Sequence, residues 1–150
     1  MRALVLAAAL ALTLAPAAFA QSAAPALIEA TSPHPVERTA DQLVAAVEKA
    51  GARVAARIDH QANARSVGTE IAPATLVVFG NPKVGTPFIA ADPRAGLDLP
   101  VRVLVFQDGE RTRMIATAPE AIVERYGLEG VDPSAMRGAI EKLMGAAAAE

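Results

Sequence analysis

Two short polar segments contain the residues best suited to chemistry. In the first, His60 follows a predicted strand at residues 53–58 and has the side chain of a general base, with Asp59 or Lys83 as its partner. The second segment, residues 79–87, is rich in Gly and Pro and offers backbone N–H groups and a lysine to an anion. The predicted ligand-binding residues are the polar side chains of both segments: Asp59, His60, Asn81, Lys83 and Thr86.

Each segment also has a purely structural interpretation. Asp59 suits the N-cap of a short helix predicted at residues 61–67, and His60 suits a hydrogen-bonded histidine at the edge of the core. Residues 79–87 suit a tight structural turn, because Gly and Pro are common in turns. Strand geometry points neighbouring side chains to opposite faces, so adjacency in sequence does not make Asp59 and His60 an acid/base pair.

Neither segment matches a motif for nucleotide binding or nucleophilic catalysis. Gly80 and Gly85 have the separation of the two glycines in a phosphate-binding P-loop. Thr86, however, stands where that loop requires Lys, and Pro82 has no amide N–H to donate. No Gly-x-Ser-x-Gly elbow is present for a hydrolase serine. The chain contains no cysteine, which excludes disulfides, thiolate metal sites and a cysteine nucleophile.

A metal site would need histidines and carboxylates from distant segments. His34 and His60 occur in unrelated contexts, and the fold would have to bring them to carboxylates such as Asp59, Asp92 or Asp98. The residues therefore define no specific metal site, and no cofactor is predicted. Four Phe, one Tyr and no Trp leave few side chains for stacking on nucleobases or sugars.

The composition indicates an exported protein of single-domain size. Hydrophobic residues make up 53% of the 150 positions, and the excess lies in the first twenty. An apolar stretch at residues 3–15 and a small-x-small ending at residues 18–20 have the pattern of a cleaved signal peptide at residues 1–20. Pro16 interrupts the stretch before it reaches the length of about 20 residues that spans a bilayer, so no stable membrane anchor is expected after cleavage.

We expect a periplasmic or secreted domain that acts on a small ligand. A net charge of -2 excludes nucleic-acid binding through a broad basic surface, and the content of Val, Leu and Ile excludes disorder. Export without cysteine favours a bacterial periplasm, where a core of this size can be stable without disulfides. A short tether at residues 21–26 precedes the domain, which we place at residues 27–147.

Apolar patterns predict strands and helices that follow one another along this domain. Period-two or continuous apolar runs predict strands at 27–30, 53–58, 74–79, 101–106 and 111–117. Helical spacing predicts helices at 36–50, 61–67 and 119–126, and a last helix from 133 onward whose alanine-rich end should fray. The order predicts a single two-layer α+β domain with a mixed, mostly antiparallel sheet of about five strands covered by helices.

Three local details follow from the same patterns. Val54, Ala56 and Ile58 alternate with polar positions and are expected on one face of their strand. The strand at 74–79 is apolar throughout and is expected to be covered on both faces. Thr117 and Glu120 have the spacing of a capping box at the start of the helix that follows them.

The assembled motifs resemble the family of domains of unknown function 302 (DUF302). The resemblance covers about residues 27 to 130 and implies a compact α+β domain, found alone or appended to other domains and sometimes dimeric. It implies no reaction. The motifs that carry it are Ser32-Pro33-His34, Arg57-Ile58-Asp59-His60, the string Phe-Gly-Asn-Pro-Lys-Val-Gly-Thr-Pro at 79–87, and Leu97-Asp98-Leu99-Pro100.

Three functions fit these features. The leading hypothesis is a periplasmic module that binds or senses a small ligand, an anion or a metal, in a pocket formed by the five polar residues named first. The second is an enzyme with His60 as general base and Asp59 or Lys83 as its partner. The third is a homodimeric interaction module whose motifs are structural, with the exposed apolar part of the last helix as its contact surface.

Overall fold

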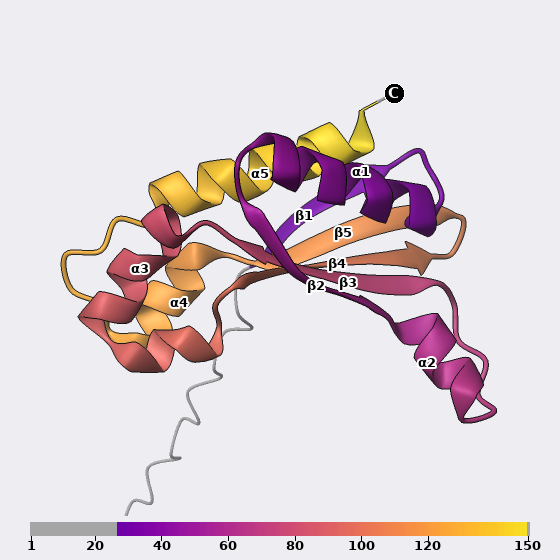
Figure 1. Cartoon of the computed structure of the whole chain (residues 1–150), viewed down its shortest axis with the longest axis horizontal. Coiled ribbons are helices and arrows are strands. Elements are labelled where there is room, and N and C mark those ends of the chain that lie inside the picture. Colours follow the sequence, from indigo (N-terminus) through magenta and orange to yellow (C-terminus); the bar gives the residue numbers. More distant parts are fainter. Residues whose placement is uncertain (1–26, 150) are drawn as a thin grey trace, which may run out of the picture.

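The computed structural model describes residues 27–149, so the expected signal peptide at 1–20 and the tether at 21–26 lie outside the described residues. Strands and helices follow one another along this range (Figure 1). Their bounds are β1 Leu27–Ser32, α1 Val36–Lys49, β2 Arg53–Asp59, α2 His60–Ser66, β3 Ala74–Gly80, α3 Pro82–Ala91, the 3-10 helix η1 Pro93–Leu97, β4 Val101–Asp108, β5 Arg111–Thr117, α4 Pro119–Tyr126 and α5 Ser134–Ala148. Within residues 27–149 no helix has the length and apolar character needed to cross a membrane.

The five strands form one sheet in the order β1-β5-β4-β3-β2. Every neighbouring pair in it is antiparallel, which confirms the α+β class and corrects the expected mixed sheet to a wholly antiparallel one. Strands β2 to β5 lie side by side in chain order, whereas β1 joins the sheet beside β5. The chain therefore passes from one edge strand, β1, to the other edge strand, β2, through α1.

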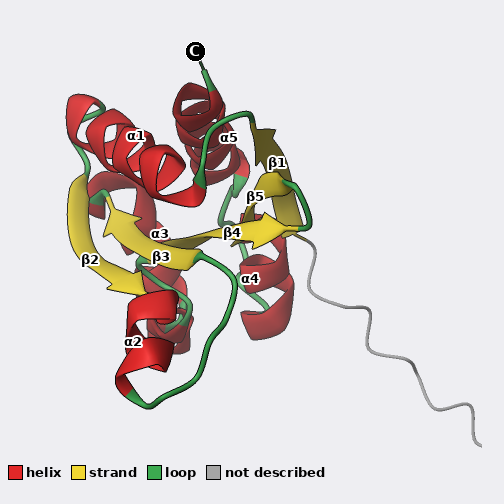
Figure 2. Cartoon of the chain, turned by 90° about the vertical axis from the view of Figure 1, so that its right-hand side faces the viewer, coloured by secondary structure: helices red, strands yellow, loops and turns green. Residues whose placement is uncertain are grey.

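Helices α1 and α5 form the second layer and cover one face of the sheet (Figures 1 and 2). In α1 the residues Val36, Ala40, Leu43 and Val47 recur three or four positions apart, so they share one side of the helix and are buried there. The apolar side of α5 is buried in the same way, so the exposed part of this helix is apolar only at small residues such as Ala139 and Ala146. The core between the layers includes Val77, Val103, Val105 and Met114 of the sheet and Met136, Ile140, Leu143 and Met144 of α5.

The alanine-rich end of α5 stays helical to Ala148, contrary to the expected fraying. The His34 Nε2 atom and the Gln42 amide both lie within hydrogen-bond distance of the Ala149 carbonyl oxygen, at 3.0 and 3.3 Å. The last carbonyls of a helix have no partner within the helix, so these two side chains satisfy a group that would otherwise depend on water.

Two details of the sheet differ from the expected pattern. A bulge in β2 shifts the register between Val54 and Ala56. Val54 pairs with the buried Phe79 and faces the helices, whereas Ala56 and Ile58 face the opposite side. Strand β3 alternates between buried and half-buried residues, because helices cover one of its faces and not both.

Arg137 of α5 holds α4 in place. Its guanidinium donates to the two carboxylate oxygens of Glu120 at 2.6 and 2.8 Å and to Glu141 at 3.0 Å. The hydrogen bonds from Arg137 lower the pKa of the Glu120 carboxyl from its ordinary value. The expected capping box is not formed, because Thr117 ends β5 and Ala118 occupies the N-cap of α4.

The Glu120 ion pair predicts a pH-dependent contribution to stability. A carboxyl whose pKa is lowered by folding stabilises the folded state above its unfolded pKa, and this contribution is lost as the pH falls through the folded-state pKa. We therefore expect Glu120→Gln to lower the free energy of unfolding at neutral pH, and the difference from the parent to vanish in acid. Urea unfolding across this pH range measures the difference.

The matched control is Glu124→Gln. Glu124 is an exposed carboxylate on the same helix and has no ion-pair partner among residues 27–149. Its replacement should leave the pH dependence of stability unchanged. A Glu120→Gln deficit that stays constant down to strongly acidic pH would contradict the ionic origin of the α4 to α5 contact.

Candidate functional site

The two segments predicted to bind ligand lie at opposite ends of the β2–β3 pair. β2 runs from Arg53, which pairs with Gly80, to Asp59, which pairs with Thr75. With 7 residues at about 3.3 Å each, the two ends of β2 are roughly 20 Å apart. The single pocket predicted from the sequence is therefore not formed: one end of the strand pair holds Asp59 and His60, and the other holds Asn81, Lys83 and Thr86.

At the first end, Asp59 and His60 mark the start of α2. The Asp59 carboxylate accepts a hydrogen bond from the Ala62 N–H at 2.9 Å, which makes it the N-cap that the structural interpretation predicts. His60 is half-buried and does not line the pocket described below. Its distance from Lys83 along the strand pair excludes a general base assisted by that lysine.

At the other end, α3 takes the place of the turn expected at residues 79–87. The side-chain oxygen of Asn81 accepts a hydrogen bond from the Lys83 N–H at 3.0 Å, so Asn81 is the N-cap. Pro82 occupies the first helical position, where a missing N–H leaves no hydrogen bond unmade. Asn followed by Pro is a helix-start signal. Gly85 and Pro87 further along α3 disfavour a helix, and they are the reason why the sequence favours a turn here.

Gly80 allows the chain entering β4 to lie against the end of β3. A Cβ atom on Gly80 would stand 3.3 Å from the Pro100 Cβ, so any side chain at position 80 requires Pro100 to move. A Cβ on Gly85 would meet the Leu99 side chain at 3.9 Å, an ordinary contact. The lack of a side chain at Gly80 thus allows residues 99–101 to lie next to the start of α3.

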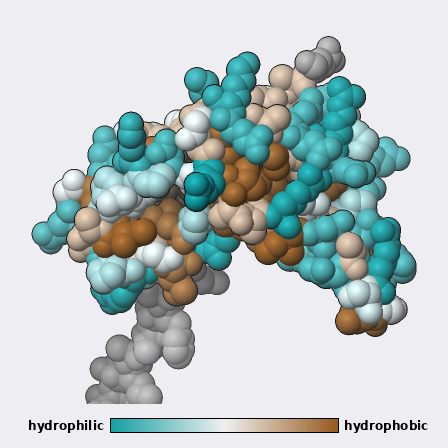
Figure 3. Space-filling model, viewed as in Figure 1, coloured by the Kyte–Doolittle hydropathy of each residue, from teal (hydrophilic) through white to brown (hydrophobic). Residues whose placement is uncertain are grey.

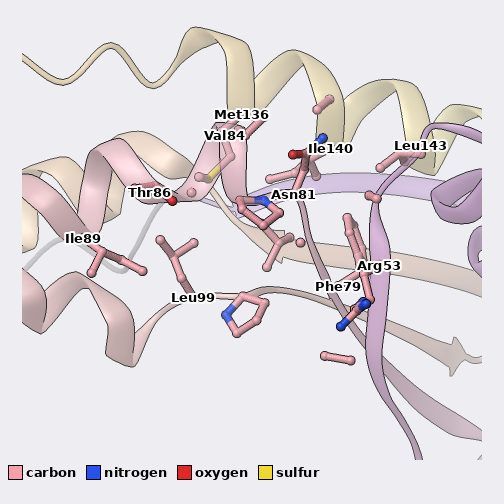
Figure 4. Close-up of a pocket in the computed structure, with 18 residues that line it drawn as sticks. Arg53, Phe79, Asn81, Val84, Thr86, Ile89, Leu99, Met136, Ile140 and Leu143 are labelled. Atoms are coloured by element: carbon pink, nitrogen blue, oxygen red, sulfur yellow. The ribbon is translucent and has the colours of Figure 1, made fainter.

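An apolar pocket of about 380 Å³ opens where these segments meet α5 (Figure 4). Its walls come from α3, the start of β2, the end of β3, residues 99–101 and residues 136–143 of α5. The volume lies near the lower end of the range of about 300–1,000 Å³ found for small-molecule sites. The labelled apolar side chains that surround the space are Phe79, Val84, Ile89, Leu99, Met136, Ile140 and Leu143.

Three polar side chains reach this pocket: Arg53, Asn81 and Thr86. Asn81 uses its oxygen to cap α3, and among residues 27–149 Arg53 forms no ion pair. Lys83 is exposed in the first turn of α3 and does not line the pocket. Arg53 is thus a pocket residue that the sequence analysis missed, since only the pairing of β2 with β3 brings it beside Gly80.

The carboxylates and histidines considered as metal ligands are dispersed. His34 contacts the end of α5, and Asp59 caps α2. Asp92 caps η1 by accepting a hydrogen bond from the Arg94 N–H at 2.8 Å. In the part of the chain that the structure describes, no three His, Asp or Glu side chains are grouped so that they could hold a metal ion.

The fold and these motifs agree with one protein family. A family model described as "Domain of unknown function DUF302" matches residues 28–149. The chain belongs to the DUF302 family. A crystal structure of a DUF302 protein from Bacillus stearothermophilus is similar to this chain, with a TM-score of 0.66 and 18% sequence identity over 81% of this chain and 94% of that one. At this identity the likeness shows a shared fold.

Curated relatives of this DUF302 chain carry the name of a channel. Fluoride-specific ion channel FluC 1 of Brucella suis biovar 1 is 33% identical over 103 residues, which are 68% of this chain and 41% of that protein. FluC 2 of Brucella melitensis biotype 1 is 33% identical over 103 residues as well, which are 38% of its length. The DUF302 chain therefore spans about two fifths of the length of these relatives.

In this DUF302 domain Asp98 fixes the segment that borders the pocket. Its side chain is 9% exposed and accepts hydrogen bonds from Arg125 at 2.7 Å, from the Tyr126 hydroxyl at 2.8 Å and from Arg102 at 3.3 Å. The bond to Asp98 raises the pKa of the Tyr126 phenol. One carboxylate thus joins α4 and β4 to residues 97–100, so the Asp of the Leu-Asp-Leu-Pro motif has a structural role.

We expect Asp98→Asn to lower the free energy of unfolding by about 1–3 kcal/mol, because it removes the charge shared by three hydrogen-bond donors. Urea unfolding at neutral pH measures this loss. Asp108→Asn is the matched control, since Asp108 is an exposed carboxylate paired with Arg113, and its replacement should cost less than about 1 kcal/mol. Equal losses in the two variants would refute a special role for the Asp98 cluster.

Proposed function

We propose that this DUF302 domain binds a small, mainly apolar molecule in the pocket between α3 and α5. The observation that carries the proposal is the apolar pocket of about 380 Å³ bordered by residues of the Phe-Gly-Asn-Pro string. Apolar walls with a few polar groups at defined places are typical of small-molecule sites. We further propose that binding takes place after export, in the periplasm or outside the cell, which rests on the signal-peptide pattern of residues 1–20.

The polar groups at the pocket indicate the chemistry of one end of the ligand. Arg53 provides a guanidinium, whose paired N–H donors match the two oxygens of a carboxylate. Thr86 and the Asn81 amide offer further hydrogen-bonding groups at the α3 side. The apolar walls suit a hydrocarbon body, so the ligand class that fits is an aliphatic or aromatic acid, in place of the free anion or metal expected from the sequence.

A bare fluoride ion, which the names of the Brucella relatives suggest, is a poor match for this pocket. A small anion gives up strongly bound water when it enters a site, and mostly apolar walls offer few donors to replace that water. Sodium fluoride therefore serves as a control ligand, and we expect it to leave the thermal unfolding of the domain unchanged.

Filling the pocket should abolish binding. We use decanoate as the probe and expect it to raise the free energy of unfolding by about 1–3 kcal/mol at saturating concentration, measured by thermal unfolding. Ala139 lines the pocket from an exposed position on α5, so Ala139→Trp should occupy the space without disturbing the core. In this variant decanoate should no longer stabilise the domain.

The matched control is Ala146→Trp, an exposed position on the same helix that does not line the pocket. It should keep the full response to decanoate. The proposal is refuted if decanoate does not stabilise the parent, or if Ala139→Trp and Ala146→Trp respond equally, because binding would then take place elsewhere on the surface.

Arg53 should select for a negatively charged end group. Arg53→Gln keeps hydrogen-bonding capacity but removes the charge, and an exposed ion pair contributes up to about 1 kcal/mol, so decanoate should bind up to about fivefold more weakly. Binding of decanol, which has the same chain and no charge, should be unchanged. Isothermal titration calorimetry measures both affinities.

The control for Arg53 is Lys142→Gln, which removes an exposed cation of α5 outside the pocket. Its affinity for decanoate should equal that of the parent. If Arg53→Gln weakens decanol and decanoate equally, Arg53 shapes the pocket and does not recognise charge.

A further inference from the structure

The outer edge of β2 is unpaired and borders the pocket. β2 is the last strand in the order of the sheet, so among residues 27–149 no strand pairs with its outer side. Figure 2 shows β2 at the margin of the sheet. Ala52, directly before this strand, and Arg53 and Ala55 within it line the pocket. An unpaired edge presents backbone N–H and C=O groups to which another extended chain can add.

The hydrogen-bond pattern of the sheet indicates which backbone groups of β2 point outward. The Gln107 N–H donates to the Pro73 carbonyl oxygen at 3.0 Å, so these two residues form a hydrogen-bonded pair at the start of β3. Such pairs alternate along antiparallel strands, so Leu76, three positions after Pro73, directs its backbone groups to β2. Ile58 pairs with Leu76 and therefore bonds to β3. The neighbouring residue, Arg57, is left with its N–H and C=O turned to the outer edge.

The surroundings of this edge suit an extended peptide. Folded proteins protect exposed edges with Pro, Lys or a bulge. β2 contains neither Pro nor Lys, and its bulge lies between Val54 and Ala56, so the edge at Arg57 is regular. The Arg57 side chain forms an ion pair with Asp41 of α1. Hydrophobic surface lies in the middle of the molecule, where β2 crosses in Figure 1 (Figure 3).

A strand that runs antiparallel to β2 brings its C-terminus to the pocket. β2 starts at Arg53, beside the pocket, and ends at Asp59, away from it. A peptide running in the opposite direction passes Arg57 and ends near Arg53. Its terminal carboxylate then lies beside a guanidinium that pairs with no carboxylate of residues 27–149. Every strand pair of this sheet is antiparallel, so such an addition continues the existing pattern.

We propose that the ligand of the pocket is the C-terminal end of a peptide whose last residue is apolar, added to the sheet along the outer edge of β2. This inference rests on the proposed function, because it uses the same pocket and identifies the source of the acid group. Backbone hydrogen bonds hold the peptide at Arg57, the pocket accepts the last side chain, and Arg53 recognises the free carboxylate. About five peptide residues, at about 3.3 Å each, cover the edge from Arg57 to Arg53.

Binding of a labelled pentapeptide tests the proposal. The probe is fluorescein-Ser-Thr-Thr-Val-Leu with a free carboxylate, and fluorescence anisotropy measures its affinity. We expect saturable binding to the parent, loss of binding in Ala139→Trp, which fills the pocket, and full binding in Ala146→Trp. The same peptide with a C-terminal amide should bind up to about fivefold more weakly, because it has no charge to pair with Arg53.

Two variants at one position isolate the backbone contribution. Arg57→Pro removes the outward N–H, a change that an edge strand tolerates, whereas Arg57→Gln keeps this N–H. Both variants lose the ion pair with Asp41. The peptide should bind about fivefold more weakly to Arg57→Pro than to Arg57→Gln, because one backbone hydrogen bond is missing. Decanoate should bind both variants equally. Equal affinity of the two variants for the peptide overturns the proposal.

Amide hydrogen exchange in the parent gives the same test without a substitution. Exchange of the Arg57 N–H, followed by NMR, should slow when the peptide is added and stay unchanged when decanoate is added. Unchanged exchange of this N–H with the peptide bound overturns the proposal. So does a peptide that fails to bind while decanoate stabilises the domain, and in that case the proposed function still stands. If neither ligand binds, both proposals fail.

Discussion

The burial of one sheet face beneath two helices is the constraint on which the rest of the structure depends. Five strands about 4.8 Å apart make a face roughly 20 Å wide, and two helices about 10 Å apart are enough to cover it. Helices α1 and α5 meet this requirement with one apolar side each. Because α5 also borders α3 and the segment before β4, the same burial that stabilises the core creates the pocket at that end.

The polar residues of the family motifs serve mainly to satisfy backbone groups and to join elements. Asp59 and Asn81 of these motifs cap helices, as does Asp92 outside them, because the first N–H groups of a helix have no partner within it. Thr39 donates to Ser32 at 2.8 Å inside the core. A polar residue in a motif therefore need not touch a ligand. What distinguishes Arg53 is that no carboxylate of residues 27–149 pairs with it, although it lies at a pocket.

Local patterns predicted the elements well, and long-range contacts explain most of the errors. The helix predicted at 36–50 and the strands predicted at 101–106 and 111–117 depend on patterns of neighbouring residues, and all three are confirmed. The bulge in β2 and the single covered face of β3 depend on which segments pack together, and the local sequence does not contain that information. The helix α3 is a different case, because its start signal was present and competed with residues that usually end helices.

For the candidate site as well, local patterns were informative and the relative placement of distant segments was not. Asn81 and Thr86 were predicted from their own segment and do line the pocket, whereas Asp59 and His60 were joined to them by residue type alone. The antiparallel pairing of β2 with β3 separates the two groups, because it places the end of β2, where Asp59 and His60 lie, a full strand length from the pocket. Polar residues that each follow a strand come together at one edge only when those strands run parallel, and here they run in opposite directions.

The segment from Leu97 to Arg102 connects the pocket to the opposite face of the sheet. Leu99 and Pro100 form part of the pocket wall, and Gly80 makes their close approach to β3 possible. Two residues later, Arg102 belongs to the opposite side of the sheet and returns to the Leu97 carbonyl and Asp98. Asp98 also accepts hydrogen bonds from Arg125 and Tyr126 of α4, so this short stretch is held from both β4 and α4. Because Leu99 and Pro100 follow Asp98 directly, the hydrogen bonds of this one carboxylate also position the wall of the pocket.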